Sequence, residues 1–139
     1  MSFTMTSVQH RDNFTIGWIC QNQTELAASE RMLDETYQNP PQDESDSNTY
    51  TLGSIGPHNN VAMSYFPSGE RGTDTAASVA KDLLRSFRNI RLGLMVGVGG
   101  GAPGHPSDDP MEDIRLGDVV VSQSGEGHGR REFDLVCRH

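Results

Sequence analysis

Lysine, cysteine and long apolar runs are scarce in this sequence, and each scarcity excludes a class of protein. Lys81 is the only lysine, and 11 Lys and Arg stand against 19 Asp and Glu, for a net charge of -8. Because nucleic-acid phosphates need a basic surface, this balance argues against a nucleic-acid partner. No apolar run reaches the length of a membrane-spanning helix, and residues 1–30 lack the basic and apolar segments of a secretion signal. We therefore expect an intracellular protein, cytoplasmic or nuclear, without a membrane partner.

Metal-binding patterns are also missing. Cys20 and Cys137 lie too far apart to form a metal knuckle, so we interpret them as free thiols of a reducing compartment. The five histidines occupy turn-like or terminal segments without metal-ligand spacing, and the acidic stretch 106–113 lacks the calcium-loop pattern. The sequence therefore predicts neither a metal nor a cofactor.

The apolar pattern predicts strands that alternate with helices. Expected strands are 14–20, 49–56, 58–66, 90–99 and 113–123, and expected helices are 24–37 and 72–87. The continuous apolar run 90–99 is typical of a central strand buried on both faces. Thr24 is the expected cap of the first helix, and Thr73 or Asp74 that of the second. This order indicates an α/β fold, a sheet layered by helices.

The polar segments indicate the domain limits. We expect residues 1–13 to be a disordered lead-in, 14–129 to be the folded domain, and 130–139 to be an irregular tail. Within the domain, the acidic and proline-rich loop 38–48 is expected to be a solvated connector. The stretch SGEGHG, residues 124–129, fits either a flexible hinge or an anion-binding nest.

The stretch LGLMVGVGGGAPGHP, residues 92–106, combines an apolar strand pattern with a glycine-rich segment. Gly97, Gly99 and Ala102 fit a dinucleotide-binding fingerprint. That fingerprint must open directly into a helix, whereas Pro103 and the prolines after it break helical continuation. The segment therefore predicts a loop that a ligand can approach closely, not a dinucleotide site.

Four stretches together resemble the nucleoside phosphorylase and nucleosidase superfamily. They are TIGWICQNQTELAASERMLDE, NTYTLGSIGPHNNVAMSYFPSGERGTDTAASVA, IRLGLMVGVGGG and DIRLGDVVVSQSGEGHG. The match is closest to the divergent fungal form, often fused to the ankyrin, TPR or NTPase modules of NOD-like receptors. It covers about residues 14–129, and its most specific part is the pair GVGGG and LGDVVV.

The resemblance implies a three-layer α/β/α sandwich around a mixed sheet, here without its C-terminal half. It also implies cleavage of the N-glycosidic bond of a purine nucleoside, with phosphate or water as co-substrate. Because superfamily members are often oligomers, it leaves open a homo-oligomer, or a partner domain that completes the sheet.

The resemblance also implies site residues. A glutamate after the first strand orients the attacking water or the ribose, and it matches Glu25, the candidate catalytic residue. The substrate-binding candidates are Gly97, Val98, Gly99, Gly100, Gly101 and Arg71. A carboxylate suits this chemistry because glycosidic cleavage builds positive charge on the sugar, and glycines let a ligand approach bare backbone. An ordinary helix N-terminal glutamate and a solvated surface arginine remain the alternatives for Glu25 and Arg71.

The sequence departs from the superfamily pattern at several positions. Phosphorolytic members bind phosphate with two arginines, and here CQNQ and Met95 stand at those places, while Val98 replaces a common serine. The half that brings the ribose-binding glutamate and the base-protonating aspartate would follow FDLVCRH. The loss of these arginines favours hydrolysis over phosphorolysis. Because one carboxylate cannot both activate a nucleophile and protonate the leaving base, we expect little or no activity.

Two functional hypotheses of different kinds follow. The first is a purine nucleosidase by ancestry that is weak or inactive in this truncated chain. The second is a non-catalytic module of a signalling receptor that senses a nucleoside or binds a partner protein. A third interpretation is a fragment without an independent fold, which would leave an open sheet edge.

Overall fold

The protein is described by a computed structural model that places residues 7–99, 115–123 and 132–137. The chain divides into two compact units, Met1–Val98 and Gly99–His139. Expectations that concern residues 1–6, 100–114 and 124–131, including the hinge or nest at 124–129, lie outside the described part. Of the expected lead-in, residues 11–13 form a turn of 3-10 helix, η1 (Arg11–Asn13).

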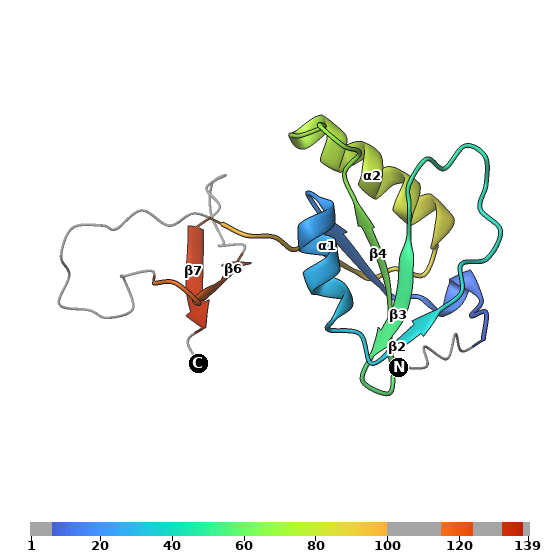
Figure 1. The fold of residues 1–139 in the computed structure, drawn as a ribbon, viewed down its shortest axis with the longest axis horizontal. Helices are drawn as coiled ribbons and strands as arrows, with labels where there is room; N and C mark the ends of the chain where they lie inside the picture. Colours follow the sequence, from blue (N-terminus) through green and yellow to red (C-terminus); the bar gives the residue numbers. More distant parts are fainter. Residues whose placement is uncertain (1–6, 100–114, 124–131, 138–139) are drawn as a thin grey trace. The chain divides into compact units, whose positions relative to one another are not determined.

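The first unit is an α/β domain with a five-stranded mixed sheet (Figure 1). Its elements are β1 (Ile16–Cys20), α1 (Gln23–Glu30), β2 (Glu35–Tyr37), β3 (Thr51–Ile55), β4 (Asn59–Tyr65), α2 (Thr73–Ser86) and β5 (Leu92–Met95). The strand order is β2-β3-β4-β1-β5, in which β1 runs parallel to both β4 and β5. The β2-β3 and β3-β4 pairs are antiparallel. The predicted α/β class and the mixed sheet are confirmed.

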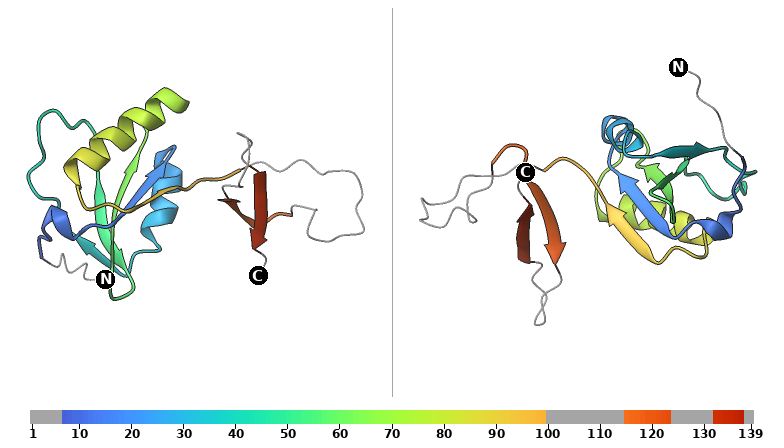
Figure 2. Two further views of the ribbon diagram at one scale, coloured as in Figure 1. Left: turned by 180° about the vertical axis from the view of Figure 1, so that it is seen from behind. Right: turned by 90° about the horizontal axis from the view of Figure 1, so that it is seen from below.

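The two helices cover opposite faces of this sheet (Figure 2). Side chains alternate along a strand, so Val61 and Met63 of β4 pack with Leu26 of α1, whereas Ala62 packs with Leu83 of α2. The buried cluster on the α2 face contains Phe14, Tyr50, Leu52, Ala62, Leu83 and Phe87, and that on the α1 face contains Cys20, Leu26, Val61 and Met63. Each face therefore holds its helix through its own apolar layer.

The first helix is shorter than predicted, and its expected cap is wrong. Asn22, not Thr24, is the N-cap, because its Oδ1 accepts a hydrogen bond from the Glu25 backbone N–H at 2.9 Å. The helix ends at Glu30, and part of the range predicted as helix forms β2. Pairing with β3 satisfies backbone groups that a continuing helix would have used.

The expected caps of the second helix are also wrong. α2 begins after Gly72, whose φ of 92° lies in the left-handed region that favours glycine, and no side chain caps the helix there. The Thr75 hydroxyl, one turn further in, donates to the Arg71 carbonyl oxygen at 3.2 Å. The backbone turn at Gly72 therefore sets the helix start in place of a Thr73 or Asp74 side chain.

The strand predicted to be central and buried is instead an edge strand of this sheet. All four residues of β5 are exposed, with Leu92 at 50% and Met95 at 57%. The chain places β1, not β5, between two parallel neighbours, so among the described residues β5 has a partner on one side alone. An apolar run alone does not distinguish these two positions.

Most of the acidic loop 38–48 is exposed, as its composition predicts, but Asp46 and Asn48 depart from a solvated connector. Asp46 is only 6% exposed, and its Oδ2 accepts hydrogen bonds from the hydroxyls of Tyr50 and Ser86. Asn48 Nδ2 donates to the Val79 carbonyl oxygen of α2 at 2.9 Å. Buried hydrogen bonds therefore tie this loop to α2 and the core.

The second unit contains an antiparallel pair of strands, β6 (Val119–Gln123) and β7 (Glu132–Cys137). The strand predicted around Val119–Val121 is present as β6. The segment 130–139, for which the sequence predicts an irregular tail, contains β7. Within the described ranges of both units, no helix is long and apolar enough to cross a membrane.

Candidate functional site

The carboxyl ends of the three parallel strands β1, β4 and β5 lie at the same end of the sheet, and the candidate site is located there. β4 and β5 flank β1 on opposite sides, and the connections to them place α1 on one face and α2 on the other. Because the neighbouring strands β1 and β4 lead into helices on opposite faces, the carboxyl end of β1 is a topological switch point. Open α/β sheets bind their ligands outside the carboxyl ends of the strands at such points.

Glu25 lies at this switch point and joins two loops. Its Oε2 accepts a hydrogen bond from the Gln21 backbone N–H at 2.9 Å, and its Oε1 accepts one from the Val98 backbone N–H at 3.1 Å. Gln21 directly follows β1, and Val98 lies shortly beyond β5. One carboxylate therefore spans the ends of two neighbouring strands.

Gly97 packs directly against this carboxylate. A Cβ atom at Gly97 would lie 2.9 Å from Glu25 Oε1 and 3.0 Å from Oε2, which is too close for any side chain unless the carboxylate moves. A Cβ at Gly99 would meet no described atom within 4 Å, and the Val98 side chain is 89% exposed. The close approach therefore favours glycine at position 97, because a Cβ there would displace the flexible end of Glu25. Gly100 and Gly101 lie outside the described residues.

The structure thus brings together three of the predicted site residues, Glu25, Gly97 and Val98. Arg71 lies in the exposed loop between β4 and α2, which follows a parallel strand at the same edge of the sheet. Among the described residues its side chain makes no hydrogen bond or ion pair. Arg71 therefore stays a substrate-binding prediction that no contact in this part of the chain supports.

Neighbouring residues that the sequence analysis missed hold the site in place. Asn22 caps the helix that presents Glu25, and Gln23 Nε2 donates to the Tyr65 hydroxyl at 3.2 Å, which links the start of α1 to the end of β4. The spacing Asn22-x-x-Glu25 is close to a capping-box pattern, a signal that could have located this helix start. Gln21 contributes through its backbone N–H, so no side-chain pattern could have identified it.

A buried cluster beneath α1 supports the helix from below. The Ser29 hydroxyl donates to the Glu25 carbonyl oxygen at 2.8 Å and accepts from Trp18 Nε1 at 3.1 Å. Cys20, whose sulfur lies 3.4 Å from that hydroxyl, is fully buried. Burial raises the pKa of the Cys20 thiol, and the charges of Glu25 and Glu30 act in the same direction. The thiol is therefore protonated at neutral pH and does not act as a nucleophile.

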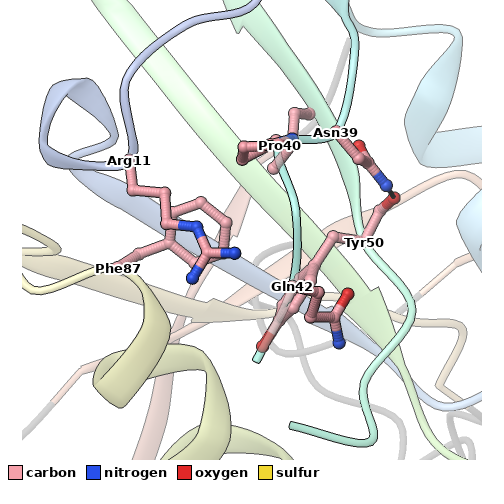
Figure 3. Close-up of a pocket in the computed structure, with 7 residues that line it drawn as sticks. Arg11, Asn39, Pro40, Gln42, Tyr50 and Phe87 are labelled. Atoms are coloured by element: carbon pink, nitrogen blue, oxygen red, sulfur yellow. Dashed lines mark hydrogen bonds between the residues drawn. The ribbon is translucent and has the colours of Figure 1, made fainter. Parts of the chain in front are cut away.

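Glu25 lines neither of two cavities found among the described residues of the first unit. The smaller one, of about 10 Å³, can hold about one water molecule. Figure 3 shows its lining residues, which include Arg11, Asn39, Tyr50 and Phe87, with Asn39 Nδ2 donating to the Tyr50 carbonyl oxygen at 2.8 Å.

The larger cavity is an open groove of about 570 Å³, lined by residues that precede β1, by the acidic loop and by the C-terminal end of α2. Arg11, Arg85 and Arg88 line it together with the carboxylates of Asp12 and Asp43. Arg85 is engaged by Asp82 at 3.1 Å and by the Ser45 carbonyl oxygen at 3.0 Å. Because acids accompany these arginines, the groove has no strong preference for an anion.

The described residues offer no candidate set of metal ligands. Across the described ranges, no group of three or more His, Cys, Asp or Glu side chains is placed to hold an ion. What the switch point offers is one carboxylate beside exposed backbone. This arrangement can accept hydrogen bonds from the hydroxyl groups of a small ligand.

The sequence is related to a fungal receptor-like protein. Over 144 aligned residues it is 44% identical to a nucleotide-binding leucine-rich repeat (NLR)-like protein of Hyaloscypha variabilis. The alignment covers 97% of this chain and 14% of that relative. No protein-family model matches the sequence. No solved structure matches it either.

Proposed function

We propose that this chain is a nucleoside-sensing module of a cytoplasmic NLR-like signalling protein. The observation that carries the proposal is the contact of Glu25 with Gly97 and Val98 at the switch point of the sheet. The similarity to an NLR-like protein supports the signalling part, because the chain corresponds to 14% of that larger relative.

The sequence resemblance supports a nucleoside as the ligand. The nucleoside phosphorylase-like form of the fold, a three-layer sandwich without its C-terminal half, is part of this proposal. The strand and helix order and the two helices on opposite faces are consistent with it. A ribose offers hydroxyl donors to a carboxylate, and the exposed backbone at Gly99, where a Cβ would meet no described atom within 4 Å, lets a sugar approach.

Sensing accounts for the site better than efficient catalysis does. Both oxygens of Glu25 already accept backbone hydrogen bonds, which makes this carboxylate a fixed recognition group. Cleavage of a nucleoside also needs a general acid for the departing base, and Glu25 cannot serve in both roles. The proposal therefore predicts that the ligand is bound and released unchanged.

Ligand-dependent thermal stability tests the proposed function. A ligand at about 100 times its dissociation constant stabilises the folded state by about 2.7 kcal/mol, so adenosine in large excess should raise the Tm clearly. Glu25→Gln should abolish the shift. Glu30→Gln should retain it, because Glu30 lies on the same helix but binds the Thr51 hydroxyl, away from the switch point. A wild-type Tm that does not respond to adenosine or to other nucleosides would overturn the proposal.

Hydrolysis of the nucleoside is the second candidate function. It is favoured by one observation, the placement of Glu25 against the glycine segment, where the resemblance implies the catalytic glutamate. Incubation of the purified chain with adenosine distinguishes the two functions by chromatography. Release of adenine by the wild type but not by Glu25→Gln would favour the enzyme, and intact adenosine would favour the sensor.

A further inference from the structure

Glu25 contacts the chain at the end of the first compact unit. That unit ends at Val98, and the second unit begins at Gly99. The paired register of β5 with β1 ends at Met95, and the last hydrogen bond to β1 runs from the Val96 N–H to the Ile19 carbonyl oxygen at 2.9 Å. Among the described residues that follow Val96, the hydrogen bond that connects this segment to the first unit runs from the Val98 N–H to Glu25 Oε1.

The side chains of this short segment add little anchoring. Gly97 has none, and the Val98 side chain is 89% exposed. The position of the segment therefore depends on one charge-assisted hydrogen bond, together with the packing of the Gly97 backbone on the carboxylate. The same carboxylate reaches back to the Gln21 N–H at 2.9 Å, so the segment is fixed to the end of β1.

We propose that Glu25 is a clasp that orders the chain at the junction of the two units, and that a ligand hydroxyl on the same carboxylate opens it. The second half of this inference rests on the proposed function. The Val98 N–H and a ligand hydroxyl would both donate to the Glu25 carboxylate. When two donors compete for the same acceptor, binding of one weakens binding of the other. Occupancy of the site would thereby change the order of Gly97 and Val98.

Glutamine is the informative substitution because it preserves the size of the side chain. The carboxylate offers an acceptor to each of the two backbone N–H groups, whereas an amide offers one oxygen and turns a donor toward the other N–H. Glu25→Gln should therefore release Val98, whose contact is the longer of the two at 3.1 Å, against 2.9 Å for Gln21. Glu30→Gln removes the same charge from the same helix and leaves an oxygen for Thr51, which makes it the matched control.

Backbone ¹⁵N relaxation at Gly97 and Val98 measures the clasp directly. In the wild type we expect order parameters near the rigid value of about 0.85, falling below about 0.6 in Glu25→Gln and unchanged in Glu30→Gln. Adenosine added to the wild type should lower the order parameters of these two residues while shifting the Gln21 amide resonance.

The outcomes separate this inference from the proposed function. Equal order at Gly97 and Val98 in Glu25→Gln and wild type would overturn the clasp. Adenosine binding, seen in the Gln21 shift, without loss of order at Val98 would overturn ligand opening and leave the sensing function intact. Absence of any adenosine-dependent shift would overturn the sensing function together with ligand opening, and the two glutamine variants would still decide the clasp.

Discussion

The Tyr50 hydroxyl donates a hydrogen bond to Asp46 Oδ2 over 2.7 Å, and both side chains are buried, at 7% and 6% exposed. Asp46 lies in the acidic loop, and Tyr50 belongs to the apolar cluster beneath α2. The pair therefore joins a segment of polar composition to the hydrophobic core. Loss of this pair should affect the stability of the whole first unit.

Asp46→Asn should destabilise the first unit. The Asp46 carboxylate accepts from the hydroxyls of Tyr50 and Ser86 and from the Asn48 backbone N–H. An asparagine would direct an amide group at one of these donors, and an unsatisfied buried group costs about 1–3 kcal/mol. Urea unfolding measures the loss. Glu44→Gln, an exposed change in the same loop, is the control, and equal stability of the two variants would contradict the prediction.

Alkaline pH should weaken the fold through Tyr50. Burial raises the pKa of Tyr50 far above its usual value, and the adjacent Asp46 carboxylate raises it further. The unfolded chain loses this proton near pH 10 while the folded state retains it, so the contribution of Tyr50 is complete below about pH 10. Above that pH the unfolding free energy should fall by up to about 1.4 kcal/mol per pH unit from this one group.

Tyr50→Phe isolates that effect. The variant should be less stable than wild type at neutral pH, because Asp46 loses a donor, and its stability should decline less steeply between pH 9 and about 11. Urea unfolding of both proteins across this range provides the comparison. Parallel curves for the two proteins would show that Tyr50 does not cause the alkaline loss.

The cap of the first helix can be tested with two neighbouring substitutions. Asn22→Ala removes the acceptor of the Glu25 N–H, and such caps contribute about 1 kcal/mol. Thr24→Ala alters an exposed position within the first turn and should change stability by no more than about 0.5 kcal/mol. Equal costs, or a larger cost for Thr24→Ala, would mean that the helix begins elsewhere.

Gly97→Ala should damage the ligand site more than the fold. The new Cβ would lie 2.9 Å from Glu25 Oε1, so the carboxylate must shift relative to the two loops that it joins. We expect loss of the adenosine-dependent rise in Tm. Gly93→Ala in β5 is the matched control, because a Cβ there would meet nothing within 4 Å among the described atoms. A full adenosine response in Gly97→Ala would show that the close contact is not needed for binding.

The sequence by itself determined both helices and most of the strands, and their order, but it missed β2 and β7. The apolar stripe Val79, Leu83 and Phe87 has helical spacing, and Val61 and Met63 alternate with polar or small neighbours in β4. These patterns depend on local geometry, the 3.6-residue and two-residue periods, and are visible in a short window of sequence. The same local information placed Glu25 after a strand, at the start of a helix.

Only the tertiary structure decided which strands are neighbours and which polar groups meet. Strand order depends on how long crossover connections pack, so the apolar run at Leu92–Met95 became an edge strand and not a central one. The hydrogen bond between Val98 and Glu25 joins residues 73 positions apart, and Ser86 and Asp46 meet across 40 positions. No periodic pattern encodes such contacts, because they arise only after the helices and the sheet have packed into layers.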